Sequence, residues 1–137
     1  MPKLPTIGSA MTAFPYLIEL DAHAAAAKTM LQQFKVHHLP VREGEKIVVV
    51  ISDQDLRRAQ ALGRDVSSDS DVRVADVCSR DVYVVEPDEP LDAVLQHMAE
   101  ARIDVVCIVD RGKLTGIFTI SDACRQFAGL LRAQSKK

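Results

Sequence analysis

Two short segments of this chain place a hydroxyl and a carboxylate three residues apart, directly after an apolar run. They are Ser52 with Asp55 and Thr119 with Asp122. The first N–H groups of a helix are unpaired and lie at the positive end of its dipole, so a hydroxyl there can help them hold a phosphate. A carboxylate one turn later offers two acceptors side by side, which suit the two hydroxyls of a ribose. The same spacing is also that of a capping box, which satisfies the helix amides without a ligand.

A pair of histidines, His37 and His38, precedes the apolar strand predicted next to the first of these segments. An imidazole there can donate a hydrogen bond to a phosphate, which in turn favours the charged form of the ring. Adjacent strand residues point to opposite sides, so at most one histidine should reach a given cleft, and the pair is a poor metal chelate. Ligand contact and a surface position both remain open for them.

Tyrosines and arginines complete the set of candidate side chains. Tyr16 and Tyr83 stand in the strands predicted to lead each half of the chain. Each ring could lie against a flat ligand group and donate its hydroxyl, or could be a half-buried strand residue. Arg57, Arg58 and Arg125 follow the carboxylates, where arginine either grips a phosphate with two hydrogen bonds or is simply solvated.

The elements that position these residues come from an internal repeat. A shift of 67 residues, without a gap, places apolar residues on apolar residues and aligns identical pairs such as Tyr16 with Tyr83 and Asp55 with Asp122. The stretch between the copies consists of turn formers without periodicity, which predicts a surface linker. We therefore predict a first repeat with an N-terminal arm at 1–62, a linker at 63–73, a second repeat at 74–131 and a tail at 132–137. Without the arm, the first repeat covers 7–62.

Each repeat is predicted to have the order β-α-β-β-α, which gives an α+β fold. Apolar residues at i, i+3 and i+4 predict one helix behind an Asp21 cap and a second, equivalent helix behind Asp88. Short apolar runs around a glycine predict a hairpin after each helix, and a final helix follows from Ser52 or Thr119. The predicted strands are 16–18, 39–41 and 47–51, then 83–85, 105–109 and 114–118.

These segments resemble the repeat of the CBS (cystathionine β-synthase-type) domain family. The resemblance rests on His37-His38-Leu39-Pro40-Val41 and the run from Val49 to Leu56, then on the run from Val105 to Asp110 and the run from Gly116 to Asp122. It implies a Bateman module, in which two repeats pack through their sheets about a pseudo-twofold axis. It also implies that clefts between the repeats bind AMP, ADP, ATP or a related adenosyl compound, and that two modules join in a disc-shaped dimer.

The two copies depart from the family pattern at different places. Asp104 stands where His37 stands in the first copy, and a carboxylate would repel an anion, so we expect a weaker phosphate end beside Thr119. Val49 stands where the second copy has Gly116, whose missing side chain would let a ligand approach the backbone.

Composition narrows the possible partners. The 137 residues carry a net charge of −2 with both signs interspersed, so we expect no nucleic-acid partner and no membrane-surface partner. No apolar run has membrane-spanning length and no signal peptide is evident, which favours the cytoplasm. Cys78, Cys107 and Cys124 are odd in number and lack a Cys-x-x-Cys motif, so they predict buried small hydrophobes rather than disulfides or a metal site.

The resemblance to the CBS family therefore implies a regulatory module that binds an adenine nucleotide and acts on another, unidentified protein. No catalysis and no required cofactor are expected, because no motif pairs the histidines and cysteines for chemistry. The alternative is a dimerisation or protein-interaction module without a ligand. A homodimer is expected in either case, through an exposed apolar stripe predicted from Leu56, Ala59 and Leu62.

Overall fold

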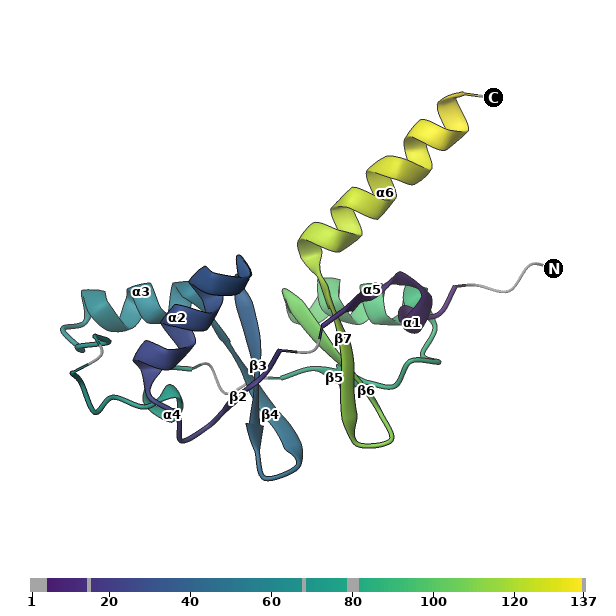
Figure 1. Cartoon of the computed structure of the whole chain (residues 1–137). Helices are drawn as coiled ribbons and strands as arrows, with labels where there is room; N and C mark the ends of the chain where they lie inside the picture. The colour runs from purple at the N-terminus through teal and green to yellow at the C-terminus, as the bar shows by residue number, and fades with distance from the viewer. Residues whose placement is uncertain (1–4, 15, 68, 79–81, 137) are drawn as a thin grey trace. The chain divides into compact units, whose positions relative to one another are not determined.

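The computed structural model describes residues 5–14, 16–67, 69–78 and 82–136, and these form two compact units (Figure 1). The first unit is Tyr16–Val82, and the second unit combines Met1–Pro15 with Tyr83–Lys137. The start of the predicted arm and the last residue of the predicted tail lie outside the described residues. Each unit has its own sheet and its own helices, so the fold is α+β as predicted.

The first unit has a three-stranded sheet of order β2-β3-β4, in which β2 is parallel to β3 and β3 is antiparallel to β4. Its β-α-β-β-α order confirms the prediction, and a four-residue helix follows it. The elements are β2 (Ile18–Glu19), α2 (Ala24–Phe34), β3 (His38–Glu43), β4 (Lys46–Ser52), α3 (Asp53–Ala61) and α4 (Val74–Val77).

The second unit repeats this plan and adds a strand at the edge. Its sheet has the order β1-β7-β6-β5, with β5 parallel to β6 and the other pairs antiparallel. The elements are α1 (Ile7–Ala10), β1 (Thr12–Ala13), β5 (Val84–Val85), α5 (Leu91–Ala101), β6 (Val105–Asp110), β7 (Lys113–Thr119) and α6 (Ile120–Ser135). Helix α6 extends beyond residue 131, the predicted end of the second repeat.

The strand centres are buried because helices cover the sheets. Leu39 and Ile51 in the first unit, and Val106 and Ile108 in the second, have no exposed surface. This agrees with the continuous apolar runs of the sequence, which are typical of strands buried on both faces. The chain turns between the hairpin strands at positive φ, with Gly44 at 63° and Gly112 at 80°, where a glycine adopts the left-handed conformation without strain.

The helices α2 and α5 begin differently from the prediction. Their N-caps are His23 and Pro90, two residues beyond Asp21 and Asp88, and no side chain caps either helix. A backbone carbonyl takes over that role: the first N–H of α2 bonds to the oxygen of Val72 at 2.8 Å. The predicted Asp21 cap is therefore wrong, because the backbone carbonyl of Val72 supplies the acceptor instead.

The segment that leads each predicted repeat packs in the unit that the other repeat mainly forms. Val74, at the start of the second repeat, donates its N–H to Ala22 of the first unit at 2.8 Å. Ile7, its equivalent, donates to Glu89 of the second unit, also at 2.8 Å. The side chains of Ile7 and Val74 are fully buried, so apolar burial holds both segments in place. The packing units therefore differ at their ends from the repeats predicted at 7–62 and 74–131.

Three further expectations are corrected by the structure. The predicted linker is not all surface, because Val66 is 1% exposed. Leu56 and Ala59 are buried in the first unit and leave only Leu62 exposed from the predicted apolar stripe. Cys124 is exposed rather than buried.

The thiol of Cys107 does follow the expectation of a buried cysteine, and burial raises its pKa to about 12. Among the residues that the structure describes, no helix is both long enough and apolar enough to cross a membrane.

Candidate functional site

Both hydroxyl–carboxylate pairs form complete capping boxes. Ser52 is the N-cap of α3: its hydroxyl accepts the N–H of Asp55 at 3.1 Å, and the Asp55 carboxylate accepts the N–H of Ser52 at 2.9 Å. Thr119 and Asp122 repeat both bonds at the start of α6 with the same two distances. The fold therefore gives the two helix N-termini the same geometry, and each carboxylate uses its Oδ2 for the cap.

The second carboxylate oxygen faces an arginine in each unit. Arg58 donates to Oδ1 of Asp55 at 3.3 Å, and Arg125 donates to Oδ1 of Asp122 at 2.9 Å. Asp55 is 4% exposed, whereas both arginine side chains are mostly exposed. An incoming hydroxyl group would therefore have to replace a solvated arginine at Oδ1 while the cap at Oδ2 stays in place.

The first unit adds an ion pair that the sequence analysis missed. Nδ1 of His37 donates to Oδ2 of Asp53 at 2.8 Å, and Arg57 lies 3.7 Å from the other oxygen of that carboxylate. Partial burial tends to raise the pKa of Asp53, but the His37 hydrogen bond and the nearby Arg57 outweigh it, so the pKa lies below its usual range. The signal for this ion pair in the sequence was Asp53, a second carboxylate in the first turn of the helix, directly after Ser52.

The two histidines separate as expected for neighbours on a strand. His38 is the first residue of β3 and lies directly opposite Ser52 of β4, so their side chains share one face of the sheet. His37 is instead held by Asp53. The structure thus brings His38, rather than His37, alongside the hydroxyl of the capping box.

The second unit has no basic residue at the equivalent positions. Val105 pairs with Thr119 where His38 pairs with Ser52, and Asp104 stands in place of His37. The backbone is the same in the two units, because the carbonyl of Asp104 accepts the N–H of Ile120 as that of His37 accepts the N–H of Asp53. Only the side chains differ at this end of the hairpin.

The two tyrosines lie just before β2 and β5, and each already has an aromatic neighbour in its own unit. The ring of Tyr16 stacks on Phe34 with centroids 3.9 Å apart and planes at 10°. The ring of Tyr83 meets His97 edge to face at 4.5 Å. Burial, and then the negative charge of Glu89, raise the pKa of the Tyr83 hydroxyl, so it stays protonated as a donor.

Gly116 has a structural reason that the sequence did not show. A Cβ at this position would lie 2.6 Å from Sδ of Met11 and 2.7 Å from the carbonyl oxygen of Thr12. Gly116 pairs with Ala13 of β1, so the backbone that approaches it belongs to this chain. The close approach expected at this glycine is thus made by β1.

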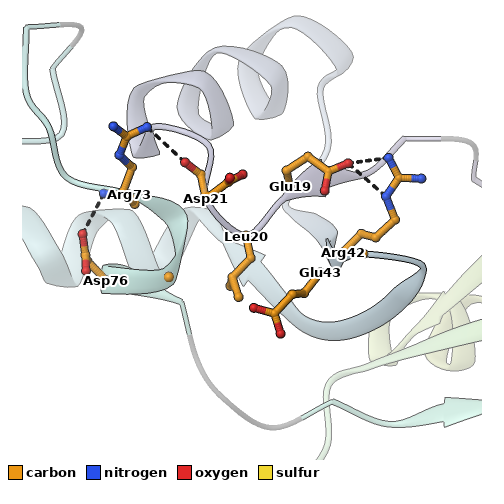
Figure 2. Close-up of a pocket in the computed structure, with 9 residues that line it drawn as sticks. Glu19, Leu20, Asp21, Arg42, Glu43, Arg73 and Asp76 are labelled. Atoms are coloured by element: carbon orange, nitrogen blue, oxygen red, sulfur yellow. Dashed lines mark hydrogen bonds and ion pairs between the residues drawn. The ribbon is translucent and has the colours of Figure 1, made fainter.

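A separate pocket of about 380 Å³ lies at the turn end of the β3–β4 hairpin (Figure 2). The charged side chains that line the pocket bond to other residues of the same unit. Arg42 donates twice to Glu19, and these hydrogen bonds raise the pKa of Arg42. Arg73 donates to the carbonyl of Asp21 at 3.1 Å. The remaining lining residues are Leu20, Glu43, Gly44, Ala75 and Asp76.

An equivalent pocket of about 440 Å³ in the second unit has Thr6 in place of Arg73, with Asp88 and Asp110 in place of Asp21 and Glu43. None of the sequence-predicted residues lines either pocket. Those residues lie at the opposite end of the hairpins, where β4 and β7 end.

Two units of one β-α-β-β-α plan, each ending in a helix that begins at a hydroxyl–carboxylate box, define a tandem-repeat module. The family model of the CBS domain matches residues 74–129, which covers the second repeat. The chain belongs to the CBS-domain family, and with the first unit it forms a CBS domain pair.

Two curated relatives are similar to this chain over most of its length. One is L-aspartate semialdehyde sulfurtransferase of Methanocaldococcus jannaschii, at 31% identity over 76% of this chain and 19% of that protein. The other is inosine-5'-monophosphate dehydrogenase of Staphylococcus haemolyticus, at 21% identity over 79% of this chain and 21% of that protein. The chain thus spans about a fifth of the length of each relative, and the match concerns that part alone.

A solved structure has the same fold over nearly the whole chain. It is the CBS domain pair of protein MJ0100 in complex with 5'-methylthioadenosine and S-adenosyl-L-methionine, with a TM-score of 0.79 and 24% identity. The similarity covers 93% of this chain and 98% of that one. At this identity the likeness establishes the fold.

Proposed function

We propose that this chain is a regulatory module that binds an adenine nucleotide and controls another protein, without catalysing a reaction itself. The observation that carries the proposal is the pair of helix N-termini with the same geometry, each with a hydroxyl and a carboxylate joined in a capping box. The MJ0100 domain pair of the same fold holds two adenosine compounds. The part these compounds share is an adenosyl group, which has the vicinal hydroxyls that a carboxylate recognises.

In the proposed complex the Asp55 carboxylate binds the ribose, Ser52 lies at the phosphate at the positive end of the α3 dipole, and Tyr16 lies near the base. His38 contributes at the phosphate end, because it shares a face of the sheet with Ser52. The cap and the ligand can use the same carboxylate, since Oδ2 serves the cap and the solvated Arg58 donates to Oδ1. Thr119, Asp122 and Tyr83 make the equivalent site of the second unit.

We further propose that AMP, ADP or ATP is the ligand, that the module works as a homodimer, and that it does so in the cytoplasm. The regulated protein is a separate chain or a further domain, as in relatives in which similar repeats form about a fifth of an enzyme. The phosphate preference follows from the positive end of the α3 dipole.

A thermal-shift panel tests the nucleotide proposal. A ligand present at about 100 times its Kd stabilises the native state by about 2.7 kcal/mol, which raises the melting temperature by several degrees. AMP, ADP, ATP and S-adenosylmethionine are compared with GMP and GTP. Stabilisation by the adenine compounds alone is expected, and no shift with any of the six contradicts the proposal.

The second candidate is an interaction module without a nucleotide. It is favoured by the capping boxes, because both are complete without a ligand and so need none to explain them. The panel separates the two candidates: the interaction module predicts no nucleotide-dependent shift together with a stable oligomer.

A further inference from the structure

The aspartate of each capping box forms an ion pair with an arginine of the same helix, three residues further along. Nη1 of Arg58 donates to Oδ1 of Asp55 at 3.3 Å, and Nη1 of Arg125 donates to Oδ1 of Asp122 at 2.9 Å. The internal repeat therefore keeps this pair as it keeps the cap. Oδ1 is also the oxygen that the proposed ribose contact requires, because Oδ2 accepts the N–H of the cap residue.

The two partners of each ion pair differ strongly in burial. The side chain of Asp55 is 4% exposed and that of Asp122 is 13% exposed, whereas Arg58 and Arg125 are 63% and 72% exposed. The capping box holds each aspartate in place, while the long arginine side chains keep their rotamer freedom in solvent. Exposed ion pairs are weak, so a ligand that reaches Oδ1 displaces the guanidinium and leaves the carboxylate where it is.

The displaced guanidinium remains near the phosphate end of the proposed site. The Asp55 carboxylate bridges Arg58 and the backbone N–H of Ser52, so the guanidinium lies one carboxyl group away from the start of α3. The second unit repeats this bridge at the start of α6. A guanidinium has five N–H donors, and two of them match two oxygens of a phosphate. The arginine can therefore pass from the aspartate to a phosphate bound beside it.

We infer that Arg58 and Arg125 exchange partners when a ligand binds, and that this exchange makes the site selective for phosphorylated adenosine. The ribose takes Oδ1 of the aspartate, and the released guanidinium pairs with the phosphate of the same ligand. A nucleoside displaces the arginine without offering it a new partner, so the exchange disfavours nucleosides and favours nucleotides. This inference rests on the proposed function and concerns the class of ligand that the same site accepts.

The neighbouring Arg57 shows that an arginine in this part of α3 can have a different partner. It lies 3.7 Å from Oδ1 of Asp53 and is 66% exposed, about as solvated as Arg58. The repeat does not keep this pair, because Cys124 stands at the equivalent position of α6 and Ile120 replaces Asp53. Of the two arginines, only the one that contacts the capping-box aspartate recurs in the second unit, which favours a role tied to that aspartate.

Isothermal titration calorimetry of the full chain with AMP and with adenosine tests the exchange. The double variant Arg58→Gln with Arg125→Gln removes both guanidinium groups. Its affinity for adenosine should rise up to about fivefold, because no exposed ion pair has to be broken. Its preference for AMP over adenosine should fall about tenfold or more, the loss typical of a charge-assisted hydrogen bond, so AMP should bind more weakly.

The matched control is Arg57→Gln with Arg132→Gln, which removes one arginine from each of the same two helices and the same net charge. Arg57 contacts Asp53, and Arg132 lies in the last turn of α6. The control should therefore keep the preference for AMP. Equal melting temperatures of the ligand-free chains would show that both double variants fold. If the control loses the preference as strongly, the effect belongs to net charge and the inference is overturned.

The salt dependence of adenosine binding gives a second test. Salt screens the exposed ion pair, so sodium chloride should tighten the binding of adenosine to the wild-type chain. The same addition should leave the double variant Arg58→Gln with Arg125→Gln unchanged, because adenosine is uncharged and no ion pair is displaced. Adenosine binding to the wild-type chain that weakens with salt would contradict the displacement.

Two results with the double variant would overturn the exchange. If AMP and adenosine both bind less tightly in the same proportion, the arginines only hold the aspartates in place. If AMP binding is unchanged or tighter, the guanidinium does not meet the phosphate. In both cases AMP still binds the wild-type chain, so the proposed function stands. No binding of either ligand to the wild-type chain overturns this inference, and the thermal-shift panel then decides the proposed function.

Discussion

The N-termini of α3 and α6 have the same capping geometry but different neighbours. Beside Ser52 the first unit places two histidines and the carboxylate of Asp53, whereas beside Thr119 the second unit places Asp104, Val105 and Ile120. The bonds of the two boxes nevertheless agree in length. The fold therefore fixes the cap, while the chemistry at the helix end varies between the copies.

The largest expected effect concerns which unit the leading segment stabilises. Ile7 has no exposed surface and belongs to the core cluster of the second unit. Ile7→Ala should therefore lower the free energy of unfolding by about 2–5 kcal/mol. Hydrogen exchange should show the loss in β6 and β7 and leave β3 and β4 protected. Loss of protection confined to β3 and β4 would contradict the placement of Ile7 in the core of the second unit. Ile120→Ala, which changes an exposed side chain, is the control.

A smaller loss is expected where the two units differ in a close contact. Gly116→Val introduces the residue that the first unit has at position 49, but its Cβ would clash with Met11 and Thr12. Overpacking of this kind costs about 1–3 kcal/mol, measured by urea unfolding. Gly129→Ala has open space around its Cβ and lies inside α6, so it should be neutral or stabilising. Equal effects of the two substitutions would refute the contact with β1.

Removal of either capping hydroxyl should lower the free energy of unfolding by the same amount. Ser52→Ala and Thr119→Ala each remove one side-chain acceptor of identical geometry, at about 1 kcal/mol each. Urea unfolding followed by hydrogen exchange in each unit measures both. A cost at one cap that exceeds the other by more than about twofold would mean that the boxes are not equivalent in solution.

The smallest expected effect is a pH dependence in the stability of the first unit that the second unit lacks. Because the folded pKa of Asp53 is lowered, its pair with His37 stabilises the first unit above the ordinary carboxyl pKa of about 4. That stabilisation is lost as the pH falls through the lowered value. His37→Gln should therefore reduce the urea midpoint of the first unit slightly at about pH 6, and its effect should fade as the pH is lowered further. A difference that persists in acid would rule out this pair as the cause.

Much of the fold could be predicted from sequence because the repeat fixes the element order. The hairpins around Gly44 and Gly112 and the two capping boxes follow from local spacing alone. The helix starts at His23 and Pro90 could not be predicted in this way, since backbone carbonyls from residues far along the chain replace an Asp cap. The packing of Ile7 and Val74 in the unit that the other repeat mainly forms has no local signal either, because it depends on which core each side chain enters.

The candidate site was predicted at the level of residues but not of their partners. The spacing of Ser52 and Asp55 identified the helix start, and the alternation along a strand predicted that the two histidines would separate. The sequence did not indicate that Asp53 would bind His37, or that an arginine would donate to Asp55 and to Asp122. These contacts depend on side-chain conformation.

In the proposed function, adenosine ligands bind at these helix ends, more tightly in the first unit. Isothermal titration calorimetry with AMP, on the wild-type chain and on Asp55→Asn and Asp122→Asn, tests it most directly. Asn keeps an acceptor for the cap but removes the charge that binds the ribose. Losing such a charged hydrogen bond costs about 1.5–3 kcal/mol, so Asp55→Asn should weaken the tight phase about tenfold or more, and Asp122→Asn should weaken it less. Equal losses would contradict the difference between the units, and no heat of binding for AMP, ADP, ATP or S-adenosylmethionine with the wild-type chain would contradict the nucleotide function itself.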